Sequence, residues 1–443
     1  MRLRALDIYL EGAKVGQLFQ YGDGPNAITR LMPDDGFWRN PRAPLLSWAT
    51  WTPPDERERF WRSYALVPFF NGQGTVLPPF FQNMLPEGAL RRHLAQERGC
   101  AIDDHFELLA ACGTDLPGAV YAYPADVSDR HVAAGIVTQH NDALEMSVIA
   151  EPLQDATSLS GMQAKLSLVV DGAGRYVART RNMDGIHIIA KLPTVEFPRL
   201  PEVEHLSLQL AAQAGVNTCS SKLAPIDEID VEIPFVLGES RSFLAVERFD
   251  RQNGKAHIHC EDFAQILNIP PEQKYTHEYA HYGLMAAVLQ QMGLGEPTVL
   301  ELLRRIVVNE MLGNFDAHVK NFGVLYADGR TPQFSPAYDI VAYAAQVPGR
   351  GHALRFTPAP QEKTTLTPRV VRDFCAIVRI PETVAQGLIR DTVKSAAQSW
   401  PDMIAESRIL PEQKTRLLDH FERVEAVKTY RRRSALGRRR AAR

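Results

Sequence analysis

Hydrophobic and polar residues alternate along the first part of the chain in the pattern of short β-strands. Residues 6–19 alternate on both sides of Glu11-Gly12, which predicts a β-hairpin with its turn at that pair. Glycine and proline punctuate the following residues, and amphipathic helices then appear. We therefore expect residues 1–118 to form a β-rich N-terminal subdomain. Two helices and a further strand are predicted in and just beyond it, over residues 86–98, 104–112 and 119–123.

Farther along, strand patterns give way to helix patterns near residue 251. Several helical segments begin with proline, whose missing N–H costs nothing in a first turn. A β-rich unit followed by a helix-rich one predicts an α+β, two-lobed protein-kinase-like fold, with residues 119–250 as the first lobe and 251–430 as the second. The expected strands cover residues 166–170, 186–192 and 243–249, and the expected helices cover residues 202–214, 279–292, 297–312, 368–378, 381–399 and 411–430.

Composition adds little bias towards any special class of protein. Of the 443 residues, 45% are hydrophobic and 23% charged, and a formal net charge of −3 favours neither nucleic acid nor membrane as a partner of the whole chain. The five cysteines are scattered, without a Cys-x-x-Cys pair, which favours a reducing compartment over a disulfide framework. No run of about 18 apolar residues and no signal-peptide core is visible. We expect a cytoplasmic protein with no membrane partner.

The sharpest chemical signal follows the predicted helix that ends at residue 312. Residues 314–321 read Asn-Phe-Asp-Ala-His-Val-Lys-Asn, and an Asp followed five positions later by an Asn is the spacing of a protein-kinase catalytic loop. Phosphoryl transfer needs a carboxylate for the attacking hydroxyl, oxygen ligands for magnesium, and positive charge near the phosphates. Asp316 is the candidate base, Asn321 a candidate magnesium ligand, and Lys320 a candidate contact of the γ-phosphate.

A second acidic candidate follows a predicted hairpin over residues 322–335. That hairpin, with its turn at Asp328-Gly329, would return the chain to Asn321 and place Asp339 beside it. Asp339 is therefore the second candidate magnesium ligand. The alternative is that Asp316 and Asn321 are ordinary turn residues and that Asp339 caps a helix.

Three more segments suggest a nucleotide site. Lys191 ends an apolar strand, where a lysine is costly unless it is paired, and Glu204 in the next predicted helix is its candidate partner. Residues 243–251 lie where a hinge strand would offer backbone groups to adenine. Residues 158–165 form a small-residue loop suited to lending N–H groups to phosphate. The alternatives are a solvent-facing edge-strand lysine and an ordinary strand end.

Taken together, these segments resemble the HipA family, the kinase toxins of HipA/HipB toxin–antitoxin pairs. The likeness covers nearly the whole chain in ordered blocks. The matching blocks are residues 79–88, 113–119, 160–165, 188–193, 246–251, 261–265, 314–321 and 338–339.

The resemblance implies a role for each matching residue, with ATP and Mg²⁺ as cofactors. Asp316 would be the catalytic base, Asn321 and Asp339 would hold Mg²⁺, and Lys191 would contact the ATP phosphates. Ser158 matches the serine that family members autophosphorylate, with Ser160 as a second candidate, and phosphorylation would expel this loop from the site by charge repulsion. The other residues expected around the nucleotide are Gly161, Met162, Gln163, Glu204, Glu247, Phe249, Asp250, His318 and Tyr338.

The resemblance also implies substrates and partners. The family substrates are translation components, notably aminoacyl-tRNA synthetases such as the glutamyl enzyme, whose phosphorylation arrests growth. The expected partner is a small helix-turn-helix antitoxin of the HipB kind, which binds operator DNA. Two features depart from the family pattern: Phe315 and Ala317 in the catalytic loop, and the arginine-rich residues 431–443, which we expect to be disordered.

Three alternatives compete with this interpretation. The run His277-Glu278-Tyr279-Ala280-His281 matches the zinc-protease motif H-E-x-x-H, with Glu301 as a candidate third ligand, provided that both histidines share one face of a helix. A second alternative is a non-catalytic corepressor, in which residues 431–443 contact DNA phosphates. A third is a kinase of small molecules. The kinase-toxin interpretation accounts for the most residues and is the one we favour.

Overall fold

The first sheet begins with the predicted hairpin. Glu11 and Gly12 both have positive φ, 49° and 80°, as a type I′ turn requires, and β1 (Arg2–Leu10) and β2 (Ala13–Tyr21) pair antiparallel around them in the computed structural model. The hairpin is thus confirmed. The structure describes residues 2–22, 27–67, 77–125, 145–146, 149–154, 156–159, 161, 163–179, 185–252, 256–358 and 365–441.

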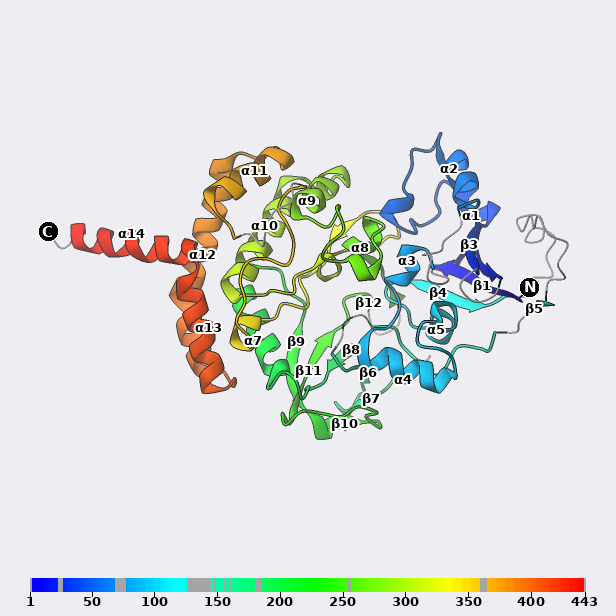
Figure 1. The fold of residues 1–443 in the computed structure, drawn as a ribbon, viewed down its shortest axis with the longest axis horizontal. Helices are drawn as coiled ribbons and strands as arrows, with labels where there is room; N and C mark the ends of the chain where they lie inside the picture. The colour runs from blue at the N-terminus through cyan, green and yellow to red at the C-terminus, as the bar shows by residue number, and fades with distance from the viewer. Residues whose placement is uncertain are drawn as a thin grey trace.

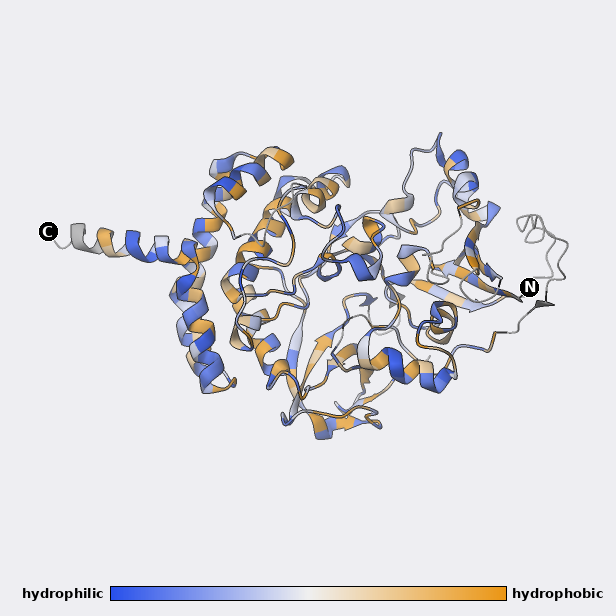
Figure 2. Ribbon diagram, in the orientation of Figure 1, coloured by the Kyte–Doolittle hydropathy of each residue, from blue (hydrophilic) through white to orange (hydrophobic). Residues whose placement is uncertain are grey.

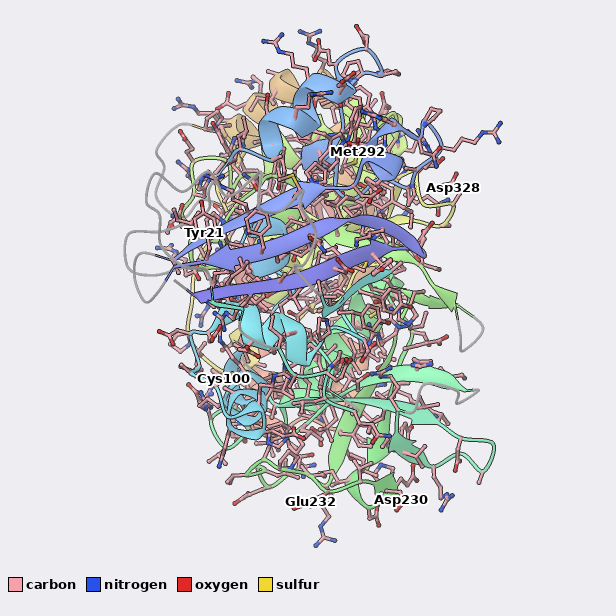
Figure 3. All side chains as sticks on the ribbon, turned by 90° about the vertical axis from the view of Figure 1, so that its right-hand side faces the viewer. Tyr21, Cys100, Asp230, Glu232, Met292 and Asp328 are labelled. Atoms are coloured by element: carbon pink, nitrogen blue, oxygen red, sulfur yellow. The ribbon has the colours of Figure 1, made fainter. Side chains whose placement is uncertain are left out.

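The hairpin is the centre of an N-terminal subdomain whose sheet has the order β3-β2-β1-β4, with β5 pairing in parallel with β1. Apolar residues such as Leu6, Ile8 and Leu18 are buried against Phe106 and Leu109 of a helix beneath the sheet. In Figure 3 the long strands run across the face of this subdomain, with Tyr21 near one end. Its other elements are β3 (Ile28–Pro33), α1 (Asp35–Arg39), η2 (Trp48–Thr50), α2 (Arg57–Tyr64), α3 (Pro79–Gln82), α4 (Gly88–Arg98), α5 (His105–Ala111), β4 (Val120–Pro124) and β5 (Glu145–Met146).

A second sheet forms the first kinase-like lobe, in the order β10-β7-β6-β8-β11-β9. One face of the sheet buries Leu168, Ile188 and Phe243 in a small core. The helix α7 packs against β11 and β9. The bounds are β6 (Lys165–Val170), β7 (Tyr176–Ala178), β8 (Ile186–Lys191), α7 (Leu200–Gln213), β9 (Ser221–Pro225), η3 (Ile226–Glu228), β10 (Ile229–Asp230) and β11 (Ser242–Glu247).

The second lobe is helical and contains the largest core, in which α10 packs against α12 and α9. A small sheet, β14-β15-β16, lies beside this helical core. Figure 1 shows the N-terminal subdomain and the C-terminal helices at opposite ends of the molecule. The bounds are β12 (Arg251–Gln252), β13 (Ala256–His257), β14 (His259–Asp262), α8 (Phe263–Ile266), η4 (Pro271–Gln273), α9 (Tyr282–Gln291), α10 (Gly295–Leu312), η5 (Val319–Asn321), β15 (Gly323–Tyr326), β16 (Gln333–Phe334), η6 (Tyr343–Ala345), α11 (Pro368–Val378), α12 (Glu382–Glu406), α13 (Pro411–Arg423) and α14 (Glu425–Ala441).

Two helix predictions need correction. The segment predicted as one helix over residues 411–430 is two helices, because Val424 adopts an extended conformation between α13 and α14. The expected disorder of residues 431–443 is not found as far as Ala441, since α14 continues to that residue and projects from the body (Figure 1). Arginine is a good helix former, so a charged run can extend a helix that is anchored at its start. Hydrophilic residues dominate α13 and the first turns of α14 (Figure 2).

Within the part of the chain that the structure describes, no helix is long and apolar enough to cross a membrane.

Candidate active site

The end of helix α10 places the candidate base. Gly313 closes the helix with φ 63°, and a Cβ at this position would lie 2.5 Å from that of Ala344, so both the turn and the close packing require glycine. Asn314 then accepts a hydrogen bond from the backbone N–H of Asp316 at 3.3 Å through its side-chain oxygen. These contacts fix the loop that carries Asp316 at the C-terminal end of a buried helix.

The carboxylate of Asp316 is partly buried and accepts a hydrogen bond from the hydroxyl of Tyr275. Burial raises the pKa of Asp316, and the negative charge of Asp339 raises it further, whereas the Tyr275 hydrogen bond lowers it. A carboxyl whose pKa is raised in a cleft is a stronger proton acceptor when ionised than one at the surface. Asp316 therefore has the environment of a general base.

A buried ion cluster lies where the two lobes meet. Lys191, at the end of β8, places its Nζ 2.5 Å from Glu204 Oε1 on α7 and 2.5 Å from Asp339 Oδ1. Burial opposes the charge of Asp339, but Lys191 and then Lys165 outweigh it and hold the pKa of Asp339 well below its ordinary value. Burial also raises the pKa of Glu204, which Lys191 counteracts. The predicted pairing of Lys191 with Glu204 has this geometry.

The backbone of Asp339 is strained. Its φ is 57°, in the left-handed region that few non-glycine residues adopt. Such outliers gather at functional sites, where the surrounding structure compensates for their cost. At this position the turn directs the carboxylate of Asp339 towards Lys191, in the cleft between the lobes.

Lys165 is a site residue that the sequence analysis did not single out. It pairs across the sheet with Lys191 in the β6–β8 register, and its Nζ would lie 2.7 Å from a Cβ on Gly161, whose φ is 99°. Burial lowers the pKa of Lys165, and the neighbouring charge of Lys191 lowers it further. The signal was present in the sequence, because Lys165 ends the loop block over residues 160–165, but only the strand register shows that two lysines stand together.

Three more candidates lie at the end of the catalytic loop, in the 3₁₀ turn η5 and at the residue just before it. Asn321 donates from Nδ2 to the backbone oxygen of Asp316 at 3.3 Å. Lys320 points to the N-terminal subdomain, where its Nζ donates to the backbone oxygen of Asn83 at 2.9 Å and lies 3.4 Å from Glu87. His318 is buried, and burial together with the charge of a nearby lysine lowers its pKa to about 3. The N-terminal subdomain thus completes one wall of the cleft.

The hinge candidates divide into two groups. The ring of Phe249 lies 5.5 Å from that of Tyr338, whose hydroxyl donates to the backbone oxygen of Lys320 at 2.8 Å, and Glu247 closes β11 beside them. The carboxylate of Asp250 instead pairs with Arg248 at 2.8 Å and with Arg251 at 2.8 Å. Its side chain therefore belongs to a buried arginine network next to the cleft.

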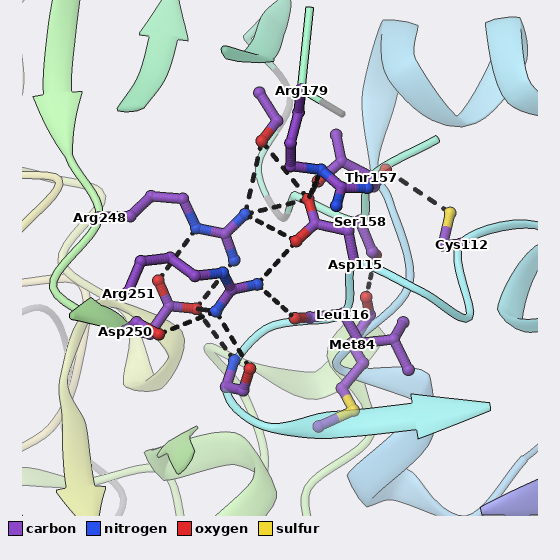
Figure 4. Close-up of polar contacts among 12 residues, drawn as sticks. Met84, Cys112, Asp115, Leu116, Thr157, Ser158, Arg179, Arg248, Asp250 and Arg251 are labelled. Carbon is purple, nitrogen blue, oxygen red and sulfur yellow. Dashed lines mark hydrogen bonds and ion pairs between the residues drawn. The ribbon is translucent and has the colours of Figure 1, made fainter. Parts of the chain in front are cut away.

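That network is centred on Asp115, which the sequence analysis placed only in a turn. Figure 4 shows the guanidinium groups of Arg179, Arg248 and Arg251 around the Asp115 carboxylate, at 3.2, 3.1 and 2.7 Å. Burial alone would raise the pKa of Asp115, but the three guanidinium groups hold it far below its ordinary value. The same carboxylate accepts a hydrogen bond from the Thr157 hydroxyl at 2.6 Å.

The loop that carries the phosphorylation candidates is fixed by this network. Ser158 is fully buried, its N–H donates to the backbone oxygen of Asp115 at 3.1 Å, and its hydroxyl donates to the backbone oxygen of Met84. Gln163 donates to the backbone oxygen of Leu192 at 2.8 Å. Ser160 and Met162 lie outside the described residues. In this conformation Ser158 is part of the cleft wall and its side chain is not accessible to solvent.

The groups around Lys191 line one space between the lobes, and Asp316 lies next to this lining through its contact with Asn321 rather than within it. The cleft has a cavity volume of about 170 Å³ and opens to solvent. A separate hollow in the N-terminal subdomain, lined by Trp38 and Trp61, contains none of the candidate groups. The residues of the cleft that the sequence analysis had named are Ser158, Gly161, Lys191, Glu204, Glu247, Phe249, Asp250, His318, Lys320, Asn321, Tyr338 and Asp339.

The zinc-protease alternative is wrong on geometry. His277 lies in a turn, and α9 begins only at Tyr282, with His281 as the residue that caps it, so the two histidines do not share a helical face. The helix that was predicted over residues 279–292 therefore begins three residues later than predicted, at Tyr282. Glu301 pairs with Arg304 and Arg305. Among the residues that the structure describes, no group of three or more His, Cys, Asp or Glu could hold a metal ion.

Comparison with known proteins agrees with this geometry. The sequence model of the HipA-like C-terminal domain matches residues 157–400, and that of the HipA N-terminal domain matches residues 6–123. The chain belongs to the HipA family. It is 30% identical over 414 residues to “Putative kinase Y4dM” of Sinorhizobium fredii, covering 93% of this chain and 94% of that one.

The relative whose name states a toxin, and the solved complex with an antitoxin, are less similar to this chain in sequence than that kinase. The serine/threonine-protein kinase toxin HipA of Shewanella oneidensis is 24% identical over 295 residues, which cover 61% of this chain and 64% of that protein. The solved complex of Shewanella HipA with HipB and its operator DNA contains a chain that matches this fold with a TM-score of 0.64, at 19% identity, over 96% of this chain and 99% of that chain. The predicted α+β, kinase-like HipA fold is confirmed.

Proposed function

We propose that this HipA-family chain is a Mg·ATP-dependent serine/threonine protein kinase and a growth-arresting toxin. The observation that carries the proposal is that two lysines and two oxygen ligands line one cleft between two lobes, with the candidate base Asp316 in contact with one of these ligands, Asn321. A corepressor without catalysis would not need Asp339 to adopt a strained backbone beside Lys191. The cleft supports catalysis and therefore the kinase over the corepressor.

The chemistry follows from the position of each group. Asp316 accepts the proton of a serine or threonine hydroxyl as that oxygen bonds to the γ-phosphorus, and the bond from this phosphorus to the bridging oxygen breaks, so that ADP leaves with the electron pair. Lys191 and Lys165 provide positive charge for the phosphates, and the ion pair with Glu204 keeps Lys191 in the cleft.

Asn321 and Asp339 fit a magnesium site. Their side chains supply an amide oxygen and an ionised carboxylate in the same cleft, which is the type of donor set that Mg²⁺ shares with substrate phosphates. When bound, Mg²⁺ would neutralise phosphate charge. The low pKa of Asp339 means that this carboxylate is available as a ligand at neutral pH, once Lys191 turns towards the phosphates.

We also propose the partners and the regulation that the family likeness implies. The substrate would be a translation component such as an aminoacyl-tRNA synthetase, glutamyl-tRNA synthetase being the precedent, and a HipB-like helix-turn-helix antitoxin would neutralise the toxin and link it to operator DNA. Autophosphorylation of Ser158 or Ser160 would inactivate the kinase. A phosphate on Ser158 could not remain where this side chain now lies, because Ser158 is fully buried and its hydroxyl already contacts the backbone oxygen of Met84.

The test is phosphate incorporation into the full chain from radiolabelled Mg·ATP, followed by peptide mass mapping. We expect incorporation into residues 157–160 for the wild type and none for Asp316→Gln, whose folding is checked by circular dichroism. Incorporation by folded Asp316→Gln at the wild-type rate would refute the role of Asp316. Phosphate found only outside residues 157–160 would reject the proposed site of autophosphorylation.

A further inference from the structure

The loop between α8 and α9 brings a tyrosine onto the candidate base. This loop, residues 270–281, contains the short turn η4 and carries Tyr275, which is 37% exposed and follows Lys274, a residue that lines the cleft. The hydroxyl of Tyr275 donates a hydrogen bond to Oδ1 of Asp316. The tyrosine ring stands edge-on to His318, with the ring centres 5.0 Å apart. Two residues of the catalytic loop therefore contact this one side chain.

Contacts on both sides of Tyr275 hold the loop in place. On one side, the Nζ of Lys274 lies 3.5 Å from Glu87 of the N-terminal subdomain and 5.6 Å from the centre of the Tyr275 ring. On the other side, Arg355 donates to the backbone oxygens of His277 at 3.1 Å and Glu278 at 3.3 Å. The hydroxyl is thus presented by a fixed support, as a preorganised contact requires.

We infer that Tyr275 is a positioning residue for phosphoryl transfer, holding the Asp316 carboxylate in the orientation that receives the acceptor hydroxyl. A carboxylate can accept several hydrogen bonds, so one from Tyr275 at Oδ1 leaves acceptor capacity for a serine or threonine hydroxyl. Burial and the Asp316 charge raise the pKa of Tyr275, so the phenol stays protonated and acts as a donor throughout the neutral range. The inference rests on the proposed kinase function and extends it to a residue outside the catalytic loop.

The hydroxyl of Tyr275 has an alternative role, and the experiment must distinguish it from the positioning role. In this alternative, the hydroxyl competes with the acceptor hydroxyl for the base that it already contacts, and it slows the reaction. Removing it would then increase the rate. A positioning role predicts the opposite sign, because a misoriented base lowers the rate of the chemical step without weakening nucleotide binding.

The experiment compares full-length wild type with Tyr275→Phe, which deletes only the hydroxyl. The matched control is Tyr279→Phe in the same loop, because Tyr279 is 49% exposed and its ring contacts His277. Phosphate transfer from Mg·ATP to casein is measured at varied Mg·ATP. We expect kcat of Tyr275→Phe to fall about tenfold or more, with KM for Mg·ATP within about twofold of the wild type, and Tyr279→Phe to match the wild type.

Each other outcome has a definite meaning. An unchanged or increased kcat in Tyr275→Phe overturns the positioning role, as does a rise in KM for Mg·ATP with kcat intact. An equal loss in Tyr279→Phe would show that the loop and not the hydroxyl matters, which also overturns it. A wild type no more active than Asp316→Gln would refute the kinase function itself. An active wild type with a fully active Tyr275→Phe refutes only the inference on Tyr275.

Discussion

Two charge clusters lie near one another in this molecule and differ in their composition and in their exposure to solvent. Around Asp115, one carboxylate is enclosed by three arginines, and all four side chains are almost completely buried. Around Lys191, one ammonium group bridges two carboxylates, and Asp339 keeps about a third of its side chain exposed at the cleft. The first cluster is closed, whereas the second borders the open cleft between the lobes.

The difference shows how position separates structural charges from functional ones. The arginine planes around Asp115 make multiple hydrogen bonds with fixed geometry, which suits a permanent connection between Asp115 of the N-terminal subdomain and the segments that carry Arg248 and Arg251, while Thr157 bonds to the same carboxylate. The lysine at the second cluster is a flexible point charge that can exchange its partner Asp339 for a phosphate. Altering the first cluster should affect folding, and altering the second should affect catalysis.

The largest expected effect is on the stability of a variant that breaks the closed cluster. Asp115→Ala leaves Arg179, Arg248 and Arg251 buried with a lost counter-charge, and removing one partner of a buried ion pair costs about 3–5 kcal/mol. The free energy of unfolding, measured in urea, should fall by that amount. Asp316→Gln is the comparison from the open cleft and should change it by less than about 1 kcal/mol. Equal losses in the two variants would contradict the distinction between the clusters.

The sequence predicted the open cleft better than the closed cluster. Asp316, Asn321 and Asp339 are found by spacing within a short stretch, because a catalytic loop and the hairpin after it are local structures. The Asp115 network joins residues more than 130 positions apart, and no local pattern distinguishes Asp115 from an ordinary turn aspartate. Lys165 and Tyr275 were missed for the same reason, since a strand register and a loop position decide what each side chain contacts.

Local patterns also explain which parts of the fold were predicted. The hairpin at Glu11-Gly12 and the helix ending at Gly313 each carry a turn residue with positive φ, so the stop signals were reliable. The part of the C-terminal helix α14 beyond residue 430 was missed, because the run of arginines there was expected to be disordered. The histidines at 277 and 281 suggested a helix by their spacing, but the chain enters α9 from an extended residue, and that backbone geometry depends on Arg355.

A second prediction extends the comparison to a buried carboxyl group that forms no ion pair with an arginine among the described residues. Glu261 accepts hydrogen bonds from the Ser47 hydroxyl at 2.6 Å and the Trp48 N–H at 2.8 Å, and no ion pair links it to a Lys or Arg of the described ranges. Burial raises its pKa to about 7, although these hydrogen bonds lower it. The contrast with Asp115 isolates the effect of the counter-charge.

The raised pKa of Glu261 fixes the sign of its pH dependence. Between about pH 4.5 and 7 the unfolded chain has lost the proton of Glu261, whereas the folded chain retains it. The free energy of unfolding therefore falls as the pH rises through this range, by roughly 3 kcal/mol in all. Above pH 7 this loss remains but does not increase further. Glu261→Gln should remove this loss, so that the stability difference between variant and wild type grows from pH 5 to pH 7. Urea midpoints measured across that range provide the check. Parallel pH profiles for the two proteins would show that the counter-charge is not what separates Glu261 from Asp115.

The smallest expected effect concerns an arginine with the same chemistry as those around Asp115 but an exposed position. Arg431 on α14 lies 2.9 Å from Glu422 on α13, with 41% and 48% of the two side chains exposed. Solvent and salt screen such a pair, and holding two long side chains together costs entropy, so Arg431→Ala should change the free energy of unfolding by no more than about 0.5 kcal/mol. A double-mutant cycle with Glu422→Gln, run at low and high salt, measures the pair itself. A coupling above about 1 kcal/mol that survives high salt would mean that exposure does not decide what an ion pair contributes here, and the contrast between the closed and open clusters would need another explanation.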